Sequence, residues 1–258
     1  CTIAIFIFFQ KKLLQMTDKN KIDAFILAAG LGKRMRHLTE DIPKPLVKVN
    51  NKPLIDYSLD YLINFGINNI IVNLHYKSET LRSYLELWQK KYKDIKFTLS
   101  FERDVLLDTG GGIVNGLNFI SSDSFFILNS DTIRVDSKKN TMNQMLSAWD
   151  KKNMDFLLLL IPVEKVQNYG RSGDFHLSSN NIVTRVNNNS SNKYIYTGLC
   201  LANTSVFLNN SEIIFSINKL WDTSIIKKRV YGLVYSGYWL HVGTPEELEY
   251  AEESLRSI

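Results

Sequence analysis

Residues 23 to 35 read DAFILAAGLGKRM, and the interpretation of the whole chain starts from this stretch. Asp23 to Ala29 is a short, largely apolar run, which is typical of a buried strand. A loop with Gly30 and Gly32 follows, and Lys33 and Arg34 come directly after it. A strand that opens into a glycine-rich loop predicts the first unit of an α/β domain.

Strand-like and helix-like patterns alternate beyond this loop, which predicts an α/β fold with a Rossmann-like mixed, mostly parallel sheet flanked by helices. Apolar residues recur at helical spacing behind Pro53, and Thr244 to Glu247 is a capping box with proline at the first helical position. We expect strands at 69–74, 95–101, 125–128, 154–161, 194–202 and 230–235, helices at 54–66, 81–88, 217–228 and from 244 onward, and a hairpin formed by 173–177 and 182–186.

Composition limits the possible partners. The chain has 258 residues, of which 45% are hydrophobic and 22% charged, as in ordinary folded proteins. The formal net charge is +5 and the basic residues form only short clusters such as Lys227 and Lys228, which favours an anionic small molecule over nucleic acid. The only cysteines are Cys1 and Cys200, so we expect no disulfide framework or metal cluster, and a reducing, cytoplasmic setting.

The first residues are interpreted separately. Cys1 to Phe9 is nearly all apolar, but a membrane-spanning helix needs about 20 such residues, and the basic leader of a signal peptide is missing. We expect no membrane partner. Residues 1–21 are interpreted as a tail that is not native or is disordered, with Met16 as the expected start, and a real hydrophobic tail as the alternative. Residues 22–258 are expected to form a single domain.

The loop after the first strand suits a polyphosphate. Its glycines allow a sharp turn and a close approach of the backbone, its amides can donate to phosphate oxygens, and Lys33 with Arg34 adds charge. A generic glycine turn is the alternative interpretation. The dinucleotide fingerprint does not fit, because Met35 occupies the third glycine position and Asn50 and Asn51 stand where an acid is expected. The ending of a Walker loop is also missing.

A lysine between two prolines follows the loop, in the segment Pro43-Lys44-Pro45. Flanking prolines restrict the backbone, so the ammonium of Lys44 is presented from a stiff segment. Such a point charge suits a phosphate, although a single lysine is more often a solvated surface group. Further on, Asp131 lies just past a predicted strand, at the edge where α/β sheets bind ligands.

Together these motifs resemble the sugar-1-phosphate nucleotidylyltransferases. The resemblance rests on Gly30-x-Gly32-x-Arg34-Met35 with Pro43-Lys44-Pro45, and it extends over about residues 22–255. Within that family the chain is similar to the bacterial N-acetylmuramate α-1-phosphate uridylyltransferases and to mannose-1-phosphate guanylyltransferase-like proteins. The remaining matching segments are Thr109-Gly110-Gly111-Gly112, Asn129-Ser130-Asp131, Tyr196-Thr197-Gly198 and Trp239-Leu240-His241-Val242-Gly243-Thr244-Pro245.

The resemblance implies transfer of a nucleoside monophosphate to a sugar 1-phosphate with release of pyrophosphate, in a nucleotide-diphospho-sugar transferase fold. It gives UTP and N-acetylmuramate α-1-phosphate, in cell-wall recycling, as the first expected substrates. It also implies site residues by role. The catalytic residues are Arg34, Lys44 and Asp131; the nucleotide-binding residues are Ala28, Ala29, Gly30, Leu31, Gly32, Lys33, Asn73, Thr109 and Gly110, with His75 a weaker candidate; the sugar-binding residues are Gly111, Tyr196, Thr197 and Gly198; and Asp131 is the ligand of Mg²⁺, or of Mn²⁺.

One position departs from the family, which commonly has a second metal-binding Asp where this chain has His241. Imidazole suits Mg²⁺ less well than carboxylate does. His241 therefore binds the metal or a phosphate, or the metal relies on Asp131 with triphosphate and water, or activity is weak. The second outcome is favoured, because Mg²⁺ often uses few protein ligands.

Several alternatives stay open. A guanylyl- or thymidylyltransferase acting on a hexose 1-phosphate is the alternative enzyme, and an inactive nucleotide-sugar-binding protein, suggested by His241 alone, is the alternative outside enzymes. A hydride-transfer enzyme is disfavoured by the missing fingerprint. The motifs leave the base, the sugar and the oligomeric state open. Arg171 or Arg185 could pair with the lactyl carboxylate of the expected sugar.

Overall fold

The structure is a computed structural model that describes residues 22–137, 140–167, 172–186, 192–208 and 210–258. The expectations for the tail 1–21 and for Arg171 lie outside these residues. Among the described residues no helix has both the length and the apolar content needed to cross a bilayer.

A parallel half of the main sheet confirms the α/β prediction. The first strand, β1 (Asp23–Leu27), lies between β4 (Asn69–Leu74) and β6 (Ser124–Asn129), and β5 (Lys96–Phe101) extends the sheet beyond β4. All these pairs are parallel. Since β4 and β6 lie on opposite sides of β1, the carboxyl end of β1 is the topological switch point, where open α/β sheets form their binding crevice.

An antiparallel half makes the sheet mixed. The long strand β11 (Lys193–Asn203) runs antiparallel to β6 and to β8 (Phe156–Pro162), and β12 (Val230–Val234) runs parallel to β8. The predicted hairpin is confirmed: β9 (Phe175–Leu177) pairs with β10 (Val183–Arg185) and also with β11. Between Tyr196 and Cys200 the register of β11 shifts, and this irregularity lies beside the crevice.

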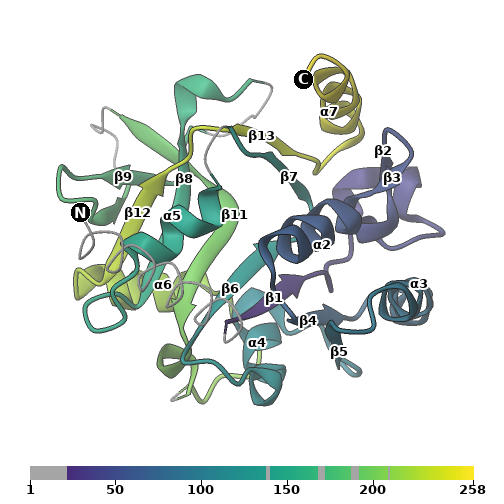
Figure 1. Cartoon of the computed structure of the whole chain (residues 1–258), viewed down its shortest axis with the longest axis horizontal. Helices are drawn as coiled ribbons and strands as arrows, with labels where there is room; N and C mark the ends of the chain where they lie inside the picture. Colours follow the sequence, from purple (N-terminus) through teal and green to yellow (C-terminus); the bar gives the residue numbers. More distant parts are fainter. Residues whose placement is uncertain (1–21, 138–139, 168–171, 187–191, 209) are drawn as a thin grey trace, which may run out of the picture.

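Helices cover both faces of the sheet. Ala24 and Ile26 of β1 point into the core under α2 (Leu54–Phe65), α3 (Ser78–Lys91) and α5 (Thr141–Ala148), whereas Phe25 points to α4 (Asp108–Asn115) and α6 (Asn218–Ile226). This alternation explains why Ala24 to Leu27 of the strand are all apolar. Figure 1 shows α3 beside β5, and α7 (Pro245–Arg256) beside the short strand β2 (Lys48–Val49).

A second, two-stranded sheet was not predicted from the sequence. It pairs β7 (Thr132–Val135) with β13 (Tyr238–His241), antiparallel, with Thr132 opposite His241. Ile133 and Leu240 pack with Met35 and with Ala251 of α7. The pairing brings Asp131, which lies between β6 and β7, next to the end of β13, although the two are far apart in sequence. The remaining short elements are η1 (Lys33–Thr39), η2 (Lys44–Leu46), β2 (Lys48–Val49), β3 (Lys52–Pro53), η3 (Leu117–Phe119), η4 (Val163–Lys165) and η5 (Thr204–Phe207).

Candidate active site

The glycine-rich loop begins where β1 ends, at the switch point of the sheet. Gly32 has φ +66°, and a Cβ there would lie 3.0 Å from Thr39 Cγ2 and 3.1 Å from Lys44 Cβ. Glycine is therefore needed both for the backbone conformation and for the close approach of the Lys44 segment. Gly30, Lys33 and Arg34 are exposed, so the loop presents backbone and cationic groups at its surface.

Lys44 lies in a stiff turn, as its flanking prolines indicated. Pro43 and Pro45 are buried, and the amides of Leu46 and Val47 donate to the carbonyls of Pro43 and Lys44 in a tight turn. From this turn the ammonium Nζ reaches Asp131 Oδ2 at 2.6 Å, although the two residues are 87 positions apart. The proline-flanked lysine and the strand-end aspartate thus meet at one place.

Asp131 lies between the main sheet and the small sheet. Ser130, just before it, donates from its amide and hydroxyl to the carbonyl of Leu27 in β1, and the amide of Val242 donates to the carbonyl of Asp131 at 2.9 Å. Burial raises the pKa of the Asp131 carboxyl, but Lys44 and His241 outweigh it and hold the pKa well below its usual range. The carboxylate is therefore ionised and can accept from cations.

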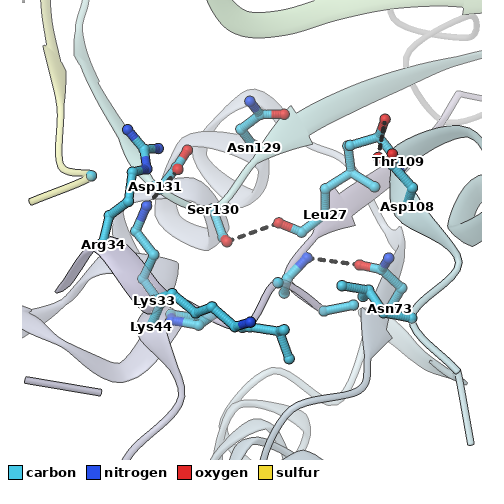
Figure 2. A pocket seen from close by; sticks show the side chains of 18 of the residues that line it. Leu27, Lys33, Arg34, Lys44, Asn73, Asp108, Thr109, Asn129, Ser130 and Asp131 are labelled. Carbon is cyan, nitrogen blue, oxygen red and sulfur yellow. Dashed lines mark hydrogen bonds and ion pairs between the residues drawn. The ribbon is translucent and has the colours of Figure 1, made fainter. Parts of the chain in front are cut away.

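One cavity of about 680 Å³ joins these groups. Figure 2 shows Arg34, Lys44 and Asp131 on one side of it, and Asn73, Asp108 and Thr109 on the other. The loop, the lysine and the aspartate therefore share a cleft, as the motifs predicted. Its described lining is Leu27, Ala28, Ala29, Gly30, Leu31, Gly32, Lys33, Arg34, Lys44, Pro45, Asn73, Leu106, Asp108, Thr109, Asn129, Ser130, Asp131, Ile214 and Gly243.

Asn73 connects the loop to the far wall of this cavity. Its Oδ1 accepts from the amide of Ala28 at 2.7 Å, and its Nδ2 donates to Glu102 Oε1 at 2.7 Å. The other carboxylate oxygen of Glu102 accepts from the amide of Leu107 at 2.8 Å. Burial raises the pKa of Glu102, and the bonds from Leu107 and Asn73 oppose it. His75 does not line the cavity; its Nδ1 faces the Glu102 carbonyl at 2.7 Å.

The glycines after Thr109 pack closely against residues 213–215. Their segment is not an open loop but the helix α4, and the amides of Gly110 and Gly111 both donate to the carbonyl of Phe215. A Cβ at Gly110 would lie 2.3 Å from the Phe215 ring, and one at Gly111 2.2 Å from the Ile213 carbonyl oxygen. These amides are therefore occupied, and neither glycine lines a described cavity. Only Thr109 of this motif lines one.

A second cavity of about 260 Å³ adjoins the first, and the two share lining residues including Arg34, Thr109 and Asp131. Tyr196 lines it, packed edge-on against Trp221 with ring centroids 4.9 Å apart. Its polar wall also includes Asp174, Asn218, Arg185 and His241. Arg185 donates to Asp222 and Asn218 and lies over the Phe175 ring.

Thr197 and Gly198 lie behind this second cavity rather than in its wall. The Thr197 hydroxyl is buried and donates to the carbonyl of Leu159, so it is not presented to the second cavity in this structure. The Thr197 carbonyl accepts from Arg134 and from Trp239 Nε1, both at 2.8 Å. Gly198 has φ +76°, and a Cβ there would lie 3.1 Å from Arg134 Nη2, so the glycine allows the close packing of β11 against Arg134.

His241 lies beside Asp131 because of the pairing of β7 with β13. Its Nε2 is 3.6 Å from Asp131 Oδ2, and its Nδ1 is 2.8 Å from Glu247 Oε2. Burial lowers the pKa of His241, but the contacts with Asp131 and Glu247 outweigh it and raise the pKa. The predicted capping box is only half formed: Glu247 N donates to Thr244 Oγ1, but the Glu247 carboxylate bonds Gly243 N and His241 instead of Thr244.

The donor set at this place fits a divalent ion held mainly by phosphate and water. Across the described ranges no group of three or more His, Cys, Asp or Glu side chains is arranged to hold a metal. Asp131 supplies one ionised carboxylate in the wall of the cavity, and Asp131 with His241 gives two candidate ligands. One or two protein ligands plus phosphate oxygens are the usual complement of Mg²⁺ in nucleotide sites.

Fold, cavity and sequence converge on one class of protein. The chain belongs to the nucleotidyl transferase family, which matches residues 23–257. Its relatives are sugar-1-phosphate nucleotidylyltransferases, so the family and the enzyme class predicted from the motifs are confirmed.

Individual relatives are similar over nearly their whole length. The chain is 32% identical over 240 residues to the N-acetylmuramate alpha-1-phosphate uridylyltransferase of Caulobacter vibrioides, covering 93% of this chain and 99% of that protein. It is 27% identical over 237 residues to the D-glycero-alpha-D-manno-heptose 1-phosphate guanylyltransferase of Aneurinibacillus thermoaerophilus, covering 91% and 99%.

Solved structures share the fold. HddC from Yersinia pseudotuberculosis, complexed with GMP-PN, matches with a TM-score of 0.69 at 25% identity, over 91% of this chain and 99% of that one. A UDP-glucose pyrophosphorylase complexed with UDP-glucose matches with a TM-score of 0.72 at 18% identity, over 92% and 98%. The predicted nucleotide-diphospho-sugar transferase fold is confirmed.

Sequence reasoning missed three groups at the site. Glu102 directly follows the predicted strand 95–101, so an acid at the ligand-binding edge was visible in the sequence, as for Asp131. Glu247 was recognised only as part of a helix cap. Arg134 gave no local signal: it is a buried cation whose contacts to Thr132 and Thr197 come from the fold, and its Nε has no hydrogen-bond partner among the described residues.

Proposed function

We propose that this protein transfers a nucleoside monophosphate from a nucleoside triphosphate to a sugar 1-phosphate, releasing pyrophosphate, and that residues 22–258 form one domain for this reaction. The observation that carries the proposal is the single cleft shared by the glycine-rich loop, Lys44 and Asp131, with a second cavity beside it. The first cavity takes the triphosphate, and the second takes the sugar.

The chain's own groups bind and orient the two phosphates. The exposed loop with Lys33 and Arg34 holds the β- and γ-phosphates. Lys44, which lines the first cavity and is paired with Asp131 of both cavities, neutralises the α-phosphate and the incoming sugar phosphate. The sugar phosphate oxygen then attacks the α-phosphorus in line, and the bond to pyrophosphate breaks. No protein nucleophile is required, since positioning and charge neutralisation supply the catalysis of phosphoryl transfer.

Asp131 would hold a divalent cation, Mg²⁺ as the motifs suggested. When bound, such an ion neutralises charge on the triphosphate and on the leaving pyrophosphate. The ammonium of Lys44 and the carboxylate of Asp131 are already paired at 2.6 Å. Both charged side chains that the reaction needs therefore lie together before the substrates bind.

Asn73 and Thr109 would bind the nucleobase and ribose end. They lie on the wall opposite Arg34 and Lys44 (Figure 2), so a nucleoside there would extend away from phosphates held by the two cations. Asp108, in the left-handed region at φ +61°, exposes acceptor groups at the same wall. Tyr196, Asp174 and Asn218 offer polar contacts to a sugar in the second cavity.

UTP and N-acetylmuramate α-1-phosphate are the proposed substrates, in cell-wall recycling and in the cytoplasm. The uridylyltransferase of Caulobacter vibrioides, at 32% identity, supports this choice. Arg185 in the second cavity supports it as well, because its guanidinium could pair with the lactyl carboxylate. A guanylyltransferase is the second candidate, favoured by the similarity to two heptose 1-phosphate guanylyltransferases and to HddC.

A crossed panel of substrates tests the proposal. Purified protein is incubated with UTP, GTP or dTTP, each with N-acetylmuramate 1-phosphate, mannose 1-phosphate or glucose 1-phosphate and Mg²⁺, and the products are identified by mass spectrometry. UDP-N-acetylmuramate with equimolar pyrophosphate is expected, and Lys44→Met serves as the inactive control. A GDP-sugar instead would establish the second candidate. Nucleotide-sugar binding without pyrophosphate from any pair would establish a binding protein and overturn the proposal.

A further inference from the structure

Arg134 is a buried cation without a matching anion. Only 8% of the residue is exposed. Its Nη2 donates to two neutral acceptors, Thr132 Oγ1 at 2.6 Å and the Thr197 carbonyl at 2.8 Å, and its Nε has no hydrogen-bond partner among the described residues. None of the ion pairs between described residues includes it. Burial lowers the pKa of the guanidinium, which nevertheless stays charged, because arginine titrates far above neutral pH.

The two acids near this guanidinium are already occupied by other groups. Asp131 is paired with Lys44 at 2.6 Å. Asp136 accepts from the hydroxyls of Tyr61 and Tyr235 at 3.0 and 3.2 Å. The other titratable neighbours of the guanidinium are tyrosines, which are neutral at physiological pH because burial raises their pKa: Tyr61, Tyr196 and Tyr235. The positive charge therefore has no ion-pair partner of its own within the described ranges.

Arg134 lies directly behind the second cavity. Thr132, which accepts from its Nη2, lines this cavity, and so does Trp239, which is its cross-strand partner in the pairing of β7 with β13. Arg134 itself lines neither of the two cavities. Its charge therefore acts on a bound substrate through the cavity wall, without a hydrogen bond.

A charge in this position stabilises a bound anion rather than the fold. Burial removes water from a guanidinium, and without a carboxylate partner this loss is not offset. Replacement of a buried ion by an apolar side chain of similar volume is often neutral or stabilising. An anion in the second cavity would supply the missing counter-charge. A unit charge at roughly 8 to 10 Å changes the affinity for a monovalent anion by about tenfold at an effective dielectric constant of about 20.

We propose that Arg134 supplies a fixed positive charge to the second cavity, which strengthens the binding of the phosphate of the sugar substrate. This inference rests on the proposed function, which assigns the sugar 1-phosphate to the second cavity. Arg134 acts more on the sugar substrate than on the nucleotide, whose triphosphate lies in the first cavity. Because it acts without contact, its charge matters more than its shape.

Steady-state kinetics of pyrophosphate release tests this charge on the intact protein, with N-acetylmuramate α-1-phosphate and UTP, and separately with mannose 1-phosphate and GTP. Arg134→Met, which removes the charge and keeps an extended side chain, should raise KM for the sugar phosphate about tenfold and KM for the nucleotide less. Urea unfolding should show this variant to be at least as stable as the wild type. Arg82→Met, at a partly exposed arginine of α3 outside both cavities, should change neither KM.

Arg134→Lys and Arg134→Gln separate the effect of charge from that of shape. Burial lowers the pKa of a lysine, so the lysine variant should bind the sugar phosphate nearly as well as the wild type at about pH 6.5 and become as weak as the glutamine variant toward about pH 9. The glutamine variant also replaces Arg134→Met in the test if the methionine variant does not fold.

Three results would overturn this inference alone: an unchanged KM for the sugar phosphate in the uncharged variants, a lysine variant as impaired as the glutamine variant at every pH, or equal effects on both KM values together with a loss of stability. Absence of pyrophosphate release by the wild type from every pair of the substrate panel would overturn the proposed function and this inference together.

Discussion

The ammonium of Lys44 and the carboxylate of Asp131 lie 2.6 Å apart, with side-chain exposures of 12% and 23%. The lysine belongs to a proline-fixed turn, and the aspartate lies in the short turn between β6 and β7, so both ends of this ion pair are held by rigid elements. Because little water reaches the pair, each charge is stabilised mainly by the other until substrate phosphates bind.

Lys44→Met should therefore abolish most of the turnover. Removal of one charge donor aimed at the reacting phosphate costs kcat about 10² to 10³, or about 3 to 4 kcal/mol of transition-state stabilisation. Steady-state kinetics of pyrophosphate release measures the loss. Lys48→Met, at an exposed lysine outside the cavities, is the matched control. Equal activities of the two variants would remove Lys44 from the reaction.

Glu102→Gln should weaken nucleotide binding more than it slows the chemical step. The carboxylate accepts from both Asn73 Nδ2 and the Leu107 amide, whereas glutamine offers only one oxygen and must turn its NH₂ toward the other donor. The lost hydrogen bond costs about 1 to 3 kcal/mol and loosens Asn73, which holds Ala28 in the loop. We expect KM for the nucleotide to rise severalfold with a smaller change in kcat. An unchanged KM would show that this link is structural only.

The same variant tests the raised pKa of Glu102. Because burial disfavours the ionised form in the folded protein, wild-type stability should increase relative to Glu102→Gln as the pH falls through the raised pKa toward the ordinary value of 4.5. The difference should level off below that value. Urea unfolding of both proteins at several pH values gives the two curves, and parallel curves would contradict the shift.

The local parts of the site were predictable from the sequence, and the non-local ones were not. The loop and the proline-flanked lysine are contiguous motifs, and Asp131 could be placed because a strand's carboxyl end is a ligand edge in any α/β sheet. The orientation of Thr197 could not be predicted, because a residue in a strand can point to either face, and only the pairing of β11 with β8 decides that its hydroxyl meets Leu159.

The packing of Gly110 and Gly111 and the position of His241 also depend on contacts between segments far apart in the sequence. Gly110 and Gly111 look like loop glycines, but their small size serves the close approach of residues 213–215, which come about a hundred positions later. The contact of His241 with Asp131 depends on the two short strands β7 and β13, whose pairing leaves no periodic pattern in the sequence.

Gly198→Ala should destabilise the protein, whereas Gly30→Ala should not. Gly198 has φ +76°, and its Cβ would lie 3.0 Å from Asn129 Cβ and 3.1 Å from an Arg134 nitrogen. A side chain in that conformation costs about 1 to 3 kcal/mol. Gly30 has no neighbour within 4 Å of the position of a Cβ. Chemical denaturation of the two variants measures the difference, and equal midpoints would contradict the described backbone at Gly198.

Gly111→Ala should affect both stability and nucleotide binding if its role is packing. The new methyl group would lie 2.2 Å from the Ile213 carbonyl oxygen. Because this oxygen belongs to the backbone, it cannot rotate away as a side chain can, and residues 213–215 must move. Overpacking of this kind costs about 1 to 3 kcal/mol. Since Ile214 lines the first cavity, the displacement should also raise KM for the nucleotide. Thermal unfolding and steady-state kinetics of the variant measure both effects; a raised KM with unchanged stability would instead support a direct contact between Gly111 and substrate.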